Sequence, residues 1–187
     1  MPNLNGLLLV VVLAASLFGT LCLFLVFPGL SVLYRLLMLA GFVLMCAVWV
    51  MTVFLSGMKR YHAIVILFGI AYGLIIALAL LLRPYGLEGL LAGFVLGHFV
   101  LVAGMWLLTA RDFLPREQLI RFDFARADML YPSLMVIGLL YNLGIWVDKF
   151  MFWYFPDTSD AVIGHLQASV IYDLPVFLSY LSIIPGM

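Results

Sequence analysis

Asp148 and Lys149 are two ionisable residues that stand side by side within residues 129–155, a run that is largely apolar and aromatic. A side chain that stays ionised at the centre of a bilayer raises the free energy of insertion by roughly 2.5–3.5 kcal/mol. We therefore expect this pair in a water-filled cavity, against a partner helix or close to the membrane surface.

The two charges differ in how they can reach water. Lys149 lies about six residues, or ~9 Å, from the outer end of the predicted span, and its long stem can carry the ammonium most of that distance. Asp148 has a short side chain and needs water, a hydrogen-bond donor or a cation within the bundle. The sequence thus favours a functional role for Asp148, whereas Lys149 is also explained by contact with the interface.

Aromatic and amide side chains accompany the pair along the same predicted helix. Asn142 and Lys149 are seven residues apart and so share one helical face. Trp146 and Trp153 flank Lys149, and an indole ring there can hold the ammonium by a cation–π contact. The candidate residues for a substrate site or cavity are Asp148, Lys149, Asn142, Trp146 and Trp153, together with His98 and Asp173 from other segments.

His98 and Asp173 each have two interpretations. His98 lies near the middle of an apolar run and is either a proton relay or cavity-lining donor, or a neutral ring bonded to a nearby backbone carbonyl. Asp173 precedes Leu174 and Pro175, which is typical of a helix N-cap. The alternative is an acidic group at the outer mouth of a pathway.

Several chemistries have no signature in the sequence. It has no Gly-rich phosphate loop, no CxxC pair and no HExxH, and we expect neither a metal nor a cofactor. No nucleophile–base pair is recognisable either, so we do not expect an enzyme. The formal net charge of zero argues against a nucleic-acid surface.

Composition places the chain in the membrane. Of its 187 residues, 67% are hydrophobic and 10% are charged, whereas a soluble domain is about half apolar and a quarter charged. A membrane span needs ~20 apolar residues. The pattern predicts an all-α polytopic protein with spans at about 7–27, 36–55, 63–82, 87–110 and 129–155, and a sixth that begins at 174.

The sixth run contains a candidate hinge at Pro185 and Gly186, near the middle of the bilayer by its spacing from Leu174. A proline within a helix produces a kink. In many transporters, interrupted helices mark the binding region. Because the run reaches the end of the chain after 14 residues, we expect the chain to be a fragment of a longer protein.

Small residues at four-residue spacing predict close helix packing. They occur in the fourth span as Gly89, Gly93 and Gly97, and in the third as Gly69 and Gly73. Such spacing aligns small residues on one helical face and lets two backbones approach closely. Static packing is the favoured interpretation, and a sliding seam is the alternative.

Basic residues predict the orientation. Alternating turns place Lys59, Arg60 and the arginines of the charged linker 111–128 on one side, against Arg35 and Arg83 on the other. By the positive-inside rule, the Lys59–Arg60 turn and the linker face the cytoplasm. Apolar residues in the linker predict a short helix on the membrane surface; they are Leu119, Ile120, Phe122 and Phe124.

Two stretches, 141–155 (YNLGIWVDKFMFWYF) and 168–187 (ASVIYDLPVFLSYLSIIPGM), closely resemble the PelG family, the membrane transporter of the Pel exopolysaccharide system. That family is similar to the multidrug/oligosaccharidyl-lipid/polysaccharide flippases. The resemblance implies two bundles of six helices around a central cavity. Residues 1–110 then correspond to four helices of the first bundle, 111–128 to a cytoplasmic linker, and 129–187 to the start of the second bundle.

The resemblance also implies a function and partners. It implies export of an amino-sugar-rich polysaccharide across the bacterial inner membrane for a biofilm matrix. The polymer would come from a cytosolic glycosyltransferase, with other membrane subunits in the complex. Two alternatives stay open: a scaffold subunit that anchors cytosolic synthesis enzymes, and a cation-coupled exporter of small molecules.

Overall fold

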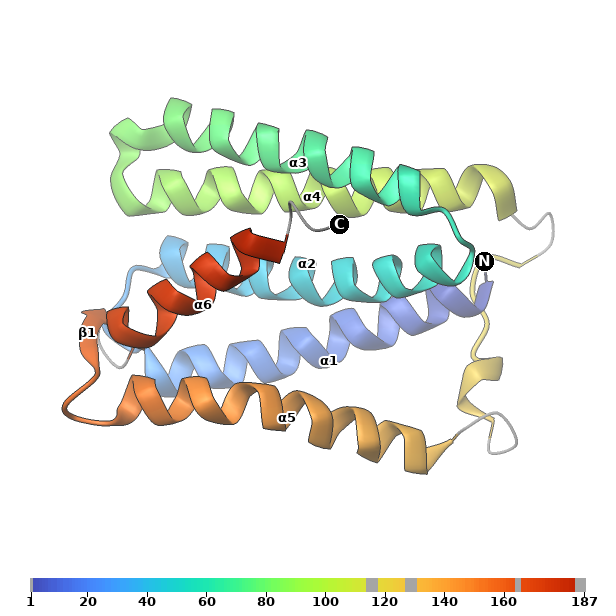
Figure 1. The fold of residues 1–187 in the computed structure, drawn as a ribbon. Helices are drawn as coiled ribbons and strands as arrows, with labels where there is room; N and C mark the ends of the chain where they lie inside the picture. The colour runs from blue at the N-terminus through green and yellow to red at the C-terminus, as the bar shows by residue number, and fades with distance from the viewer. Residues whose placement is uncertain (1, 114–117, 127–130, 164–165, 184–187) are drawn as a thin grey trace. The chain divides into compact units, whose positions relative to one another are not determined.

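The computed structural model describes residues 2–113, 118–126, 131–163 and 166–183, which form an α-helical protein with one short β-hairpin (Figure 1). The chain divides into two compact units, residues 1–127 and 128–187. Apolar segments long enough to cross a membrane are Pro2–Val26, Val32–Gly57, the continuous stretch Tyr61–Phe113, and Pro132–Tyr154. The expected all-α membrane fold is confirmed.

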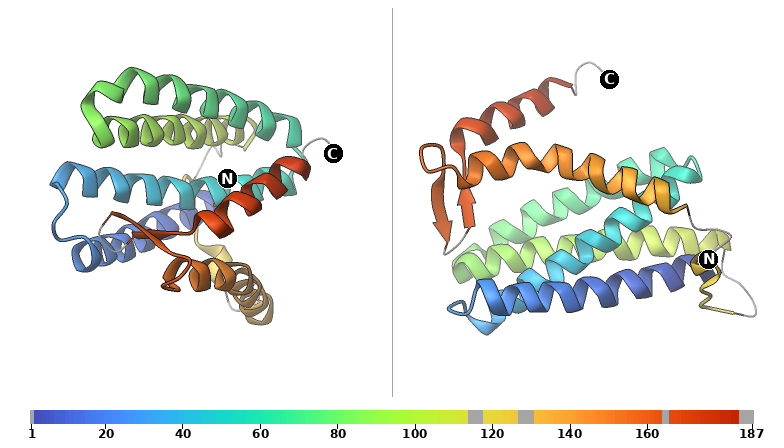
Figure 2. Two further views of the ribbon diagram at one scale, coloured as in Figure 1. Left: turned by 60° about the vertical axis from the view of Figure 1, so that its left-hand side comes forward. Right: turned by 90° about the horizontal axis from the view of Figure 1, so that it is seen from below.

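The first unit consists of four long antiparallel helices (Figure 2). They are α1 (Pro2–Val26), α2 (Val32–Gly57), α3 (Tyr61–Leu82) and α4 (Gly86–Phe113), with the 3₁₀ turns η1 (Arg83–Tyr85) and η2 (Asp123–Ala125). Helix α4 packs on both α3 and α2, and α2 packs on α1. The buried core of this unit comprises Leu4, Met51, Leu55, Ala71, Leu101 and Met105.

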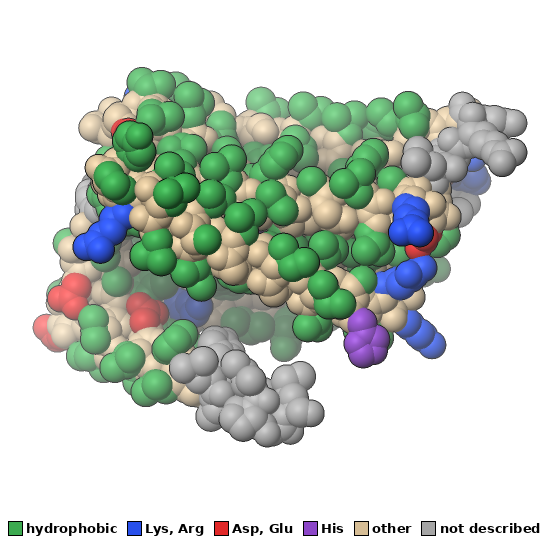
Figure 3. All heavy atoms as spheres, turned by 90° about the horizontal axis from the view of Figure 1, so that it is seen from above, with side chains coloured by type: hydrophobic (Ala, Val, Ile, Leu, Met, Phe, Trp, Pro, Cys, Tyr) green, Lys and Arg blue, Asp and Glu red, His purple; other side chains and the backbone are tan. Residues whose placement is uncertain are grey.

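Hydrophobic side chains cover the visible faces of these helices, while Lys and Arg gather at the helix ends (Figure 3). Large apolar residues such as Leu17, Val65 and Leu81 are at least 70% exposed. Because contiguous apolar surface of this extent is unfavourable in water, it indicates contact with lipid.

The helices extend beyond the apolar runs that predicted them. Helix α1 begins at Pro2 instead of residue 7, and α2 begins at Val32 instead of residue 36. Ser31 caps α2, because its side chain accepts a hydrogen bond from the Tyr34 N–H at 3.1 Å. Hydrophobicity marks the part of a helix that lies in hydrocarbon, whereas capping groups decide where the helix ends.

The turn after α2 brings two charged segments together. Lys59 adopts a left-handed conformation with φ 58°, its N–H donates to the Ser56 carbonyl, and the Arg60 N–H donates to the Leu55 carbonyl. This is the Schellman pattern that satisfies the last carbonyls of a helix. Arg60 then forms a 2.5 Å ion pair with Asp112 at the end of α4.

Glycines allow α4 to approach α3 closely. Gly89, Gly93 and Gly97 are all buried. A Cβ added to Gly93 would lie 2.8 Å from the Ala79 backbone nitrogen, and one added to Gly97 would meet the Ile75 side chain. In contrast, a Cβ on Gly69 or Gly73 would meet no described atom within 4 Å, so the packing role expected of these two glycines is not seen in this unit.

The linker differs from its prediction as a surface helix. Helix α4 includes the first three residues of the linker and ends at Phe113, and among the described residues beyond it only the three-residue turn η2 is helical. The segment instead bonds to the start of α1: the Arg121 N–H donates to the Pro2 carbonyl, and the Asp123 N–H donates to the Asn3 side chain. The Asn5 amide donates to the Leu119 carbonyl at 2.8 Å. These backbone groups bond to α1, so they do not form helical bonds with each other.

The second unit contains α5 (Pro132–Tyr154), the antiparallel strands β1 (Asp160–Ile163) and β2 (Leu166–Ala168), and α6 (Val170–Ile183). Pro132 occupies the first turn of α5, where its missing N–H is tolerated. The connection between α5 and α6 contains the hairpin, and α6 begins at Val170, four residues before the predicted start of the sixth span at Leu174. The Tyr172 and Asp173 N–H groups donate to the Ser169 carbonyl, which starts the helix before the apolar run. Pro185 and Gly186 lie outside the described residues.

Replacing Gly93 with Ala tests the close approach of α3 and α4. We expect it to lower the free energy of unfolding in detergent by about 1–3 kcal/mol, because the Ala79 backbone must move. Gly73→Ala is the matched control and should be neutral or slightly stabilising, since Ala favours helix by up to about 1 kcal/mol over Gly. Equal losses from both substitutions would contradict the packing argument.

Replacing Gly6 with Val tests the attachment of the linker to α1. A Cβ at Gly6 would collide with the Arg121 carbonyl oxygen. We expect cleavage by trypsin after Arg121, followed by mass spectrometry, to become several-fold faster as the segment detaches. Gly69→Val introduces the same side chain into open space and should leave this cleavage rate unchanged.

Candidate substrate-contact site

The candidate site of the second unit lies on α5 and on the first turn of α6. The hairpin between these helices returns the chain, so that Asp173 reaches Trp153 and the Tyr172 ring stacks on Phe152 at 4.7 Å. At 100° per residue, Asn142, Trp146, Lys149 and Trp153 fall within about 60° of one another around α5. We call these four residues the α5 stripe.

The two tryptophans of the stripe form an aromatic cluster with Phe150. The ring centroids of Trp146 and Trp153 are 6.4 Å apart in an edge-to-face arrangement. Phe150 lies 6.1 Å from Trp146 and 6.3 Å from Trp153. Such pairs stabilise each other by about 0.5–1.5 kcal/mol beyond their burial. The cluster therefore presents rigid ring faces, although Trp146 itself is exposed.

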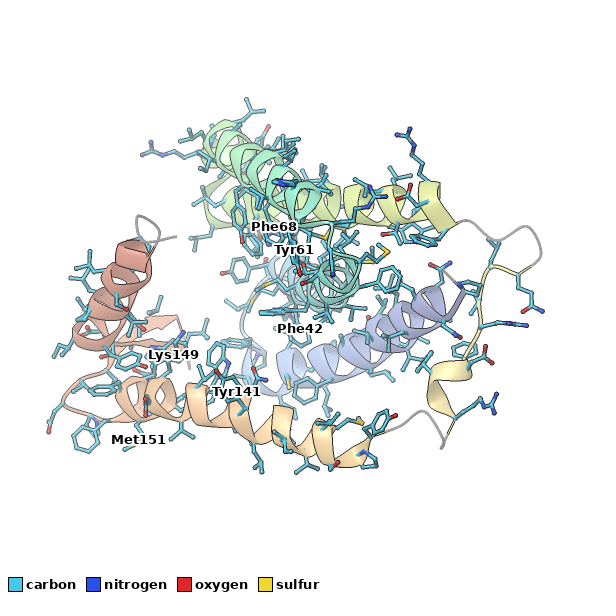
Figure 4. All side chains as sticks on the ribbon, turned by 45° about the vertical axis from the view of Figure 1, so that its right-hand side comes forward. Phe42, Tyr61, Phe68, Tyr141, Lys149 and Met151 are labelled. Carbon is cyan, nitrogen blue, oxygen red and sulfur yellow. The ribbon has the colours of Figure 1, made fainter. Side chains whose placement is uncertain are left out.

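Within the stripe, Lys149 lies against Trp146. Its Nζ lies 4.7 Å from the centre of the Trp146 ring, the cation–π contact that the spacing suggested. Lys149 and Met151 leave opposite sides of α5 (Figure 4). The indole ring offsets part of the hydration free energy that the ammonium loses in an apolar environment. This contact explains how a lysine is tolerated in this apolar helix.

Asp173 fixes Trp153. Its two carboxylate oxygens accept from the Trp153 indole N–H at 3.2 and 3.0 Å, and one of them also accepts from the Ser169 backbone N–H at 3.1 Å. Asp173 is the fourth residue of α6, so it is not the N-cap that the sequence suggested. It satisfies the same kind of unpaired N–H group from within the first turn and joins α6 to α5.

Asp148 lies beside the stripe and not in it. The helical rotation separates Asp148 from Lys149 by about 100° and from Trp153 by about 140°. Its side chain is exposed and makes no hydrogen bond or ion pair with any residue that the structure describes. Asn142 is also exposed, but its amide donates to the Gly138 carbonyl at 2.8 Å.

His98 belongs to the first unit, whereas the α5 stripe belongs to the second. It is 4% exposed, and its Nδ1 lies 2.9 Å from the Phe94 carbonyl oxygen. This contact agrees with the interpretation of His98 as a ring bonded to a nearby backbone carbonyl. The ring also lies 4.1 Å from that of Phe94.

Three contributors to the site were not among the predicted residues: Phe150, Tyr172 and Ser169. Phe150 follows Trp146 by four residues and precedes Trp153 by three, a spacing from which its place in the cluster could have been predicted. Tyr172 and Ser169 depend on the hairpin, which has no clear signal in the sequence. In the described part of the chain, no group of three or more His, Cys, Asp or Glu residues could hold a metal ion.

The comparison with protein families matches residues 1–187 to PelG, described as "Putative exopolysaccharide Exporter (EPS-E)". The chain belongs to the PelG family. The resemblance noted in the two C-terminal stretches is thereby confirmed over the whole chain. Comparisons with curated proteins and with solved structures gave no match. The PelG description is that of an exporter and not of an enzyme, and it agrees with the apolar helices of a membrane protein.

The Trp153–Asp173 contact can be measured with a double-mutant cycle. We expect Asp173→Asn and Trp153→Phe each to lower the unfolding free energy, with a coupling of about 1.5–3 kcal/mol as for hydrogen bonds to charged groups. Thermal or denaturant unfolding in detergent gives the four values. Asp160→Asn, an exposed carboxylate on β1, is the control and should show no coupling to Trp153. Additive effects of Asp173→Asn and Trp153→Phe would contradict the contact.

Proposed function

We propose that this protein exports an amino-sugar-rich exopolysaccharide across the bacterial inner membrane for a biofilm matrix, and that the α5 stripe contacts the polymer. Membership of the PelG family supports polysaccharide export. The observation that supports the stripe is its exposed Trp146, which has Lys149 over its ring and is packed against Trp153.

The chemistry of the stripe suits a sugar chain in transit. One face of a pyranose ring carries C–H groups, and these pack on the electron-rich face of an aromatic ring. Such contacts are weak and tolerate sliding, which an exporter needs because each residue of the polymer must bind and then leave. Asn142 and Lys149 add hydrogen-bonding groups that hydroxyls can meet.

Asp148 supplies a negative charge, opposite in sign to that of Lys149. An amino sugar with a free amine carries an ammonium, and the Asp148 carboxylate, which has no partner among the described residues, can pair with it. Charge-assisted hydrogen bonds of this kind stabilise by about 1.5–3 kcal/mol. The exposed position of Asp148 on a helix of membrane-spanning length supports an aqueous cavity along that side of α5, because lipid would not solvate the carboxylate.

The proposed orientation places the Lys59–Arg60 turn and the linker 111–128 in the cytoplasm. The Arg60–Asp112 ion pair supports a common side for these segments, because it joins the two helix ends. A cytosolic glycosyltransferase and other membrane subunits of a Pel-type complex are the proposed partners. A scaffold role is the second candidate, supported by Leu119, Ile120 and Phe122, which stay about half exposed or more on the attached linker.

Replacing Asp148 with Asn tests the proposed role of the carboxylate. We expect export of polymer to fall about tenfold, equivalent to ~1.4 kcal/mol, at unchanged protein level. Extracellular polymer is measured against membrane-inserted protein by immunoblot. Asp157→Asn, in the loop that follows α5, is the charge-matched control and should export normally.

Normal export by Asp148→Asn at normal protein level would contradict the proposed role of this carboxylate. If Trp146→Leu and Trp153→Leu also left export unchanged, the polymer contact of the stripe would be wrong. The scaffold candidate predicts a different result, in which replacing the linker arginines abolishes co-purification of the synthesis enzymes while polymer passage stays intact.

A further inference from the structure

The first unit contains a groove that the stripe does not use. It has a volume of about 320 Å³, at the lower end of the range for small-molecule sites. Its lining comes from the central turns of three helices: Met45, Val48, Trp49 and Thr52 of α2, Phe68 and Tyr72 of α3, and His98 of α4. Every residue of the groove belongs to the one compact unit.

His98 gives this groove a directed polar atom. A carbonyl oxygen only accepts hydrogen bonds, so the contact with Phe94 puts a proton on Nδ1 of His98. The neutral ring then carries its acceptor at Nε2, which makes no hydrogen bond with any described residue. The ring is 96% buried and lines the groove. Nε2 is therefore the acceptor that His98 offers to a ligand in the groove, and a ligand hydroxyl can donate to it.

The walls of the groove are aromatic. Tyr72 stacks on Phe68 with ring centroids 5.9 Å apart, and it meets His98 edge-on at 6.1 Å. Trp49 is 69% exposed, so most of its ring surface is open. Thr52 adds a hydroxyl whose described partner is the Met105 sulfur at 4.0 Å, a weak acceptor.

We infer that this groove binds a single sugar residue, as a second subsite for the polymer in the first unit. A pyranose offers C–H faces to Trp49 and Tyr72 and a hydroxyl donor to Nε2 of His98. A lipid tail would fill the apolar part of the groove but would leave Nε2 unpaired. This inference rests on the proposed function, because it takes the exported polysaccharide as the source of the sugar.

The test uses the full-length protein in lipid nanodiscs and a tetrasaccharide of N-acetylglucosamine or of glucosamine as the probe, with binding measured by calorimetry. We expect saturable binding that weakens about tenfold in His98→Phe, which keeps a ring but removes the acceptor. His98→Gln, which retains an acceptor, should lose less. Trp49→Leu should also weaken binding. His62→Phe makes the same change outside the groove, at the start of α3, and should bind normally.

The outcomes separate this subsite from the α5 stripe. Affinity that falls in His98→Phe and Trp49→Leu, but not in Trp146→Leu, supports the groove. Affinity that falls only in Trp146→Leu overturns the groove and leaves the stripe standing. Absence of saturable binding for both probes also overturns the groove, whereas the export assay on Asp148→Asn still decides the proposed function. Unfolding temperatures in the nanodisc identify any variant that fails to fold, and His98→Gln then carries the test.

Discussion

The hydrocarbon interior of a membrane solvates neither backbone amides nor charges, and this constraint organises the whole structure. Helices satisfy the backbone groups internally. Polar side chains within the helices return to the backbone one turn earlier: Thr109 donates to the Met105 carbonyl, Asn142 to the Gly138 carbonyl, and the His98 ring bonds to the Phe94 carbonyl. Two polar groups do not follow this pattern. The Asp148 carboxylate and Nε2 of His98 make no hydrogen bond within the described part of the chain, and we base the two proposed sugar contacts on them.

The same constraint determines how the helices associate. Lipid tails are as apolar as leucine, so burial of apolar surface does not drive two helices together in a bilayer. Close contact has to provide the attraction, and small residues make it possible. Gly93 and Gly97 bring α4 against α3 along one face, and Gly6 allows the backbone of the linker to lie on α1. The position of the linker is thus determined by a missing side chain and by hydrogen bonds to asparagines of α1.

Two charged side chains of the second unit are stabilised by contacts with aromatic rings. Lys149 rests on Trp146, and Asp173 accepts the indole N–H of Trp153. Each tryptophan therefore has one function within the fold, and the exposed ring of Trp146 still offers surface to a sugar. Rings that are fixed in this way lose little conformational freedom when a ligand binds, which suits weak and repeated contacts with a moving polymer.

The sequence by itself determined the membrane class, the number of helices and most of their extent, because a bilayer requires long apolar runs. It also determined the identity of the α5 stripe, since four residues at helical spacing share a face wherever a helix forms. Tertiary structure decided what spacing cannot encode. The hydrogen bond between Asp173 and Trp153 and the path of the linker along α1 depend on partners more than ten residues away. The groove around His98 likewise exists only because three helices meet there. Local patterns fix periodicity, whereas contacts between distant segments depend on how the helices pack.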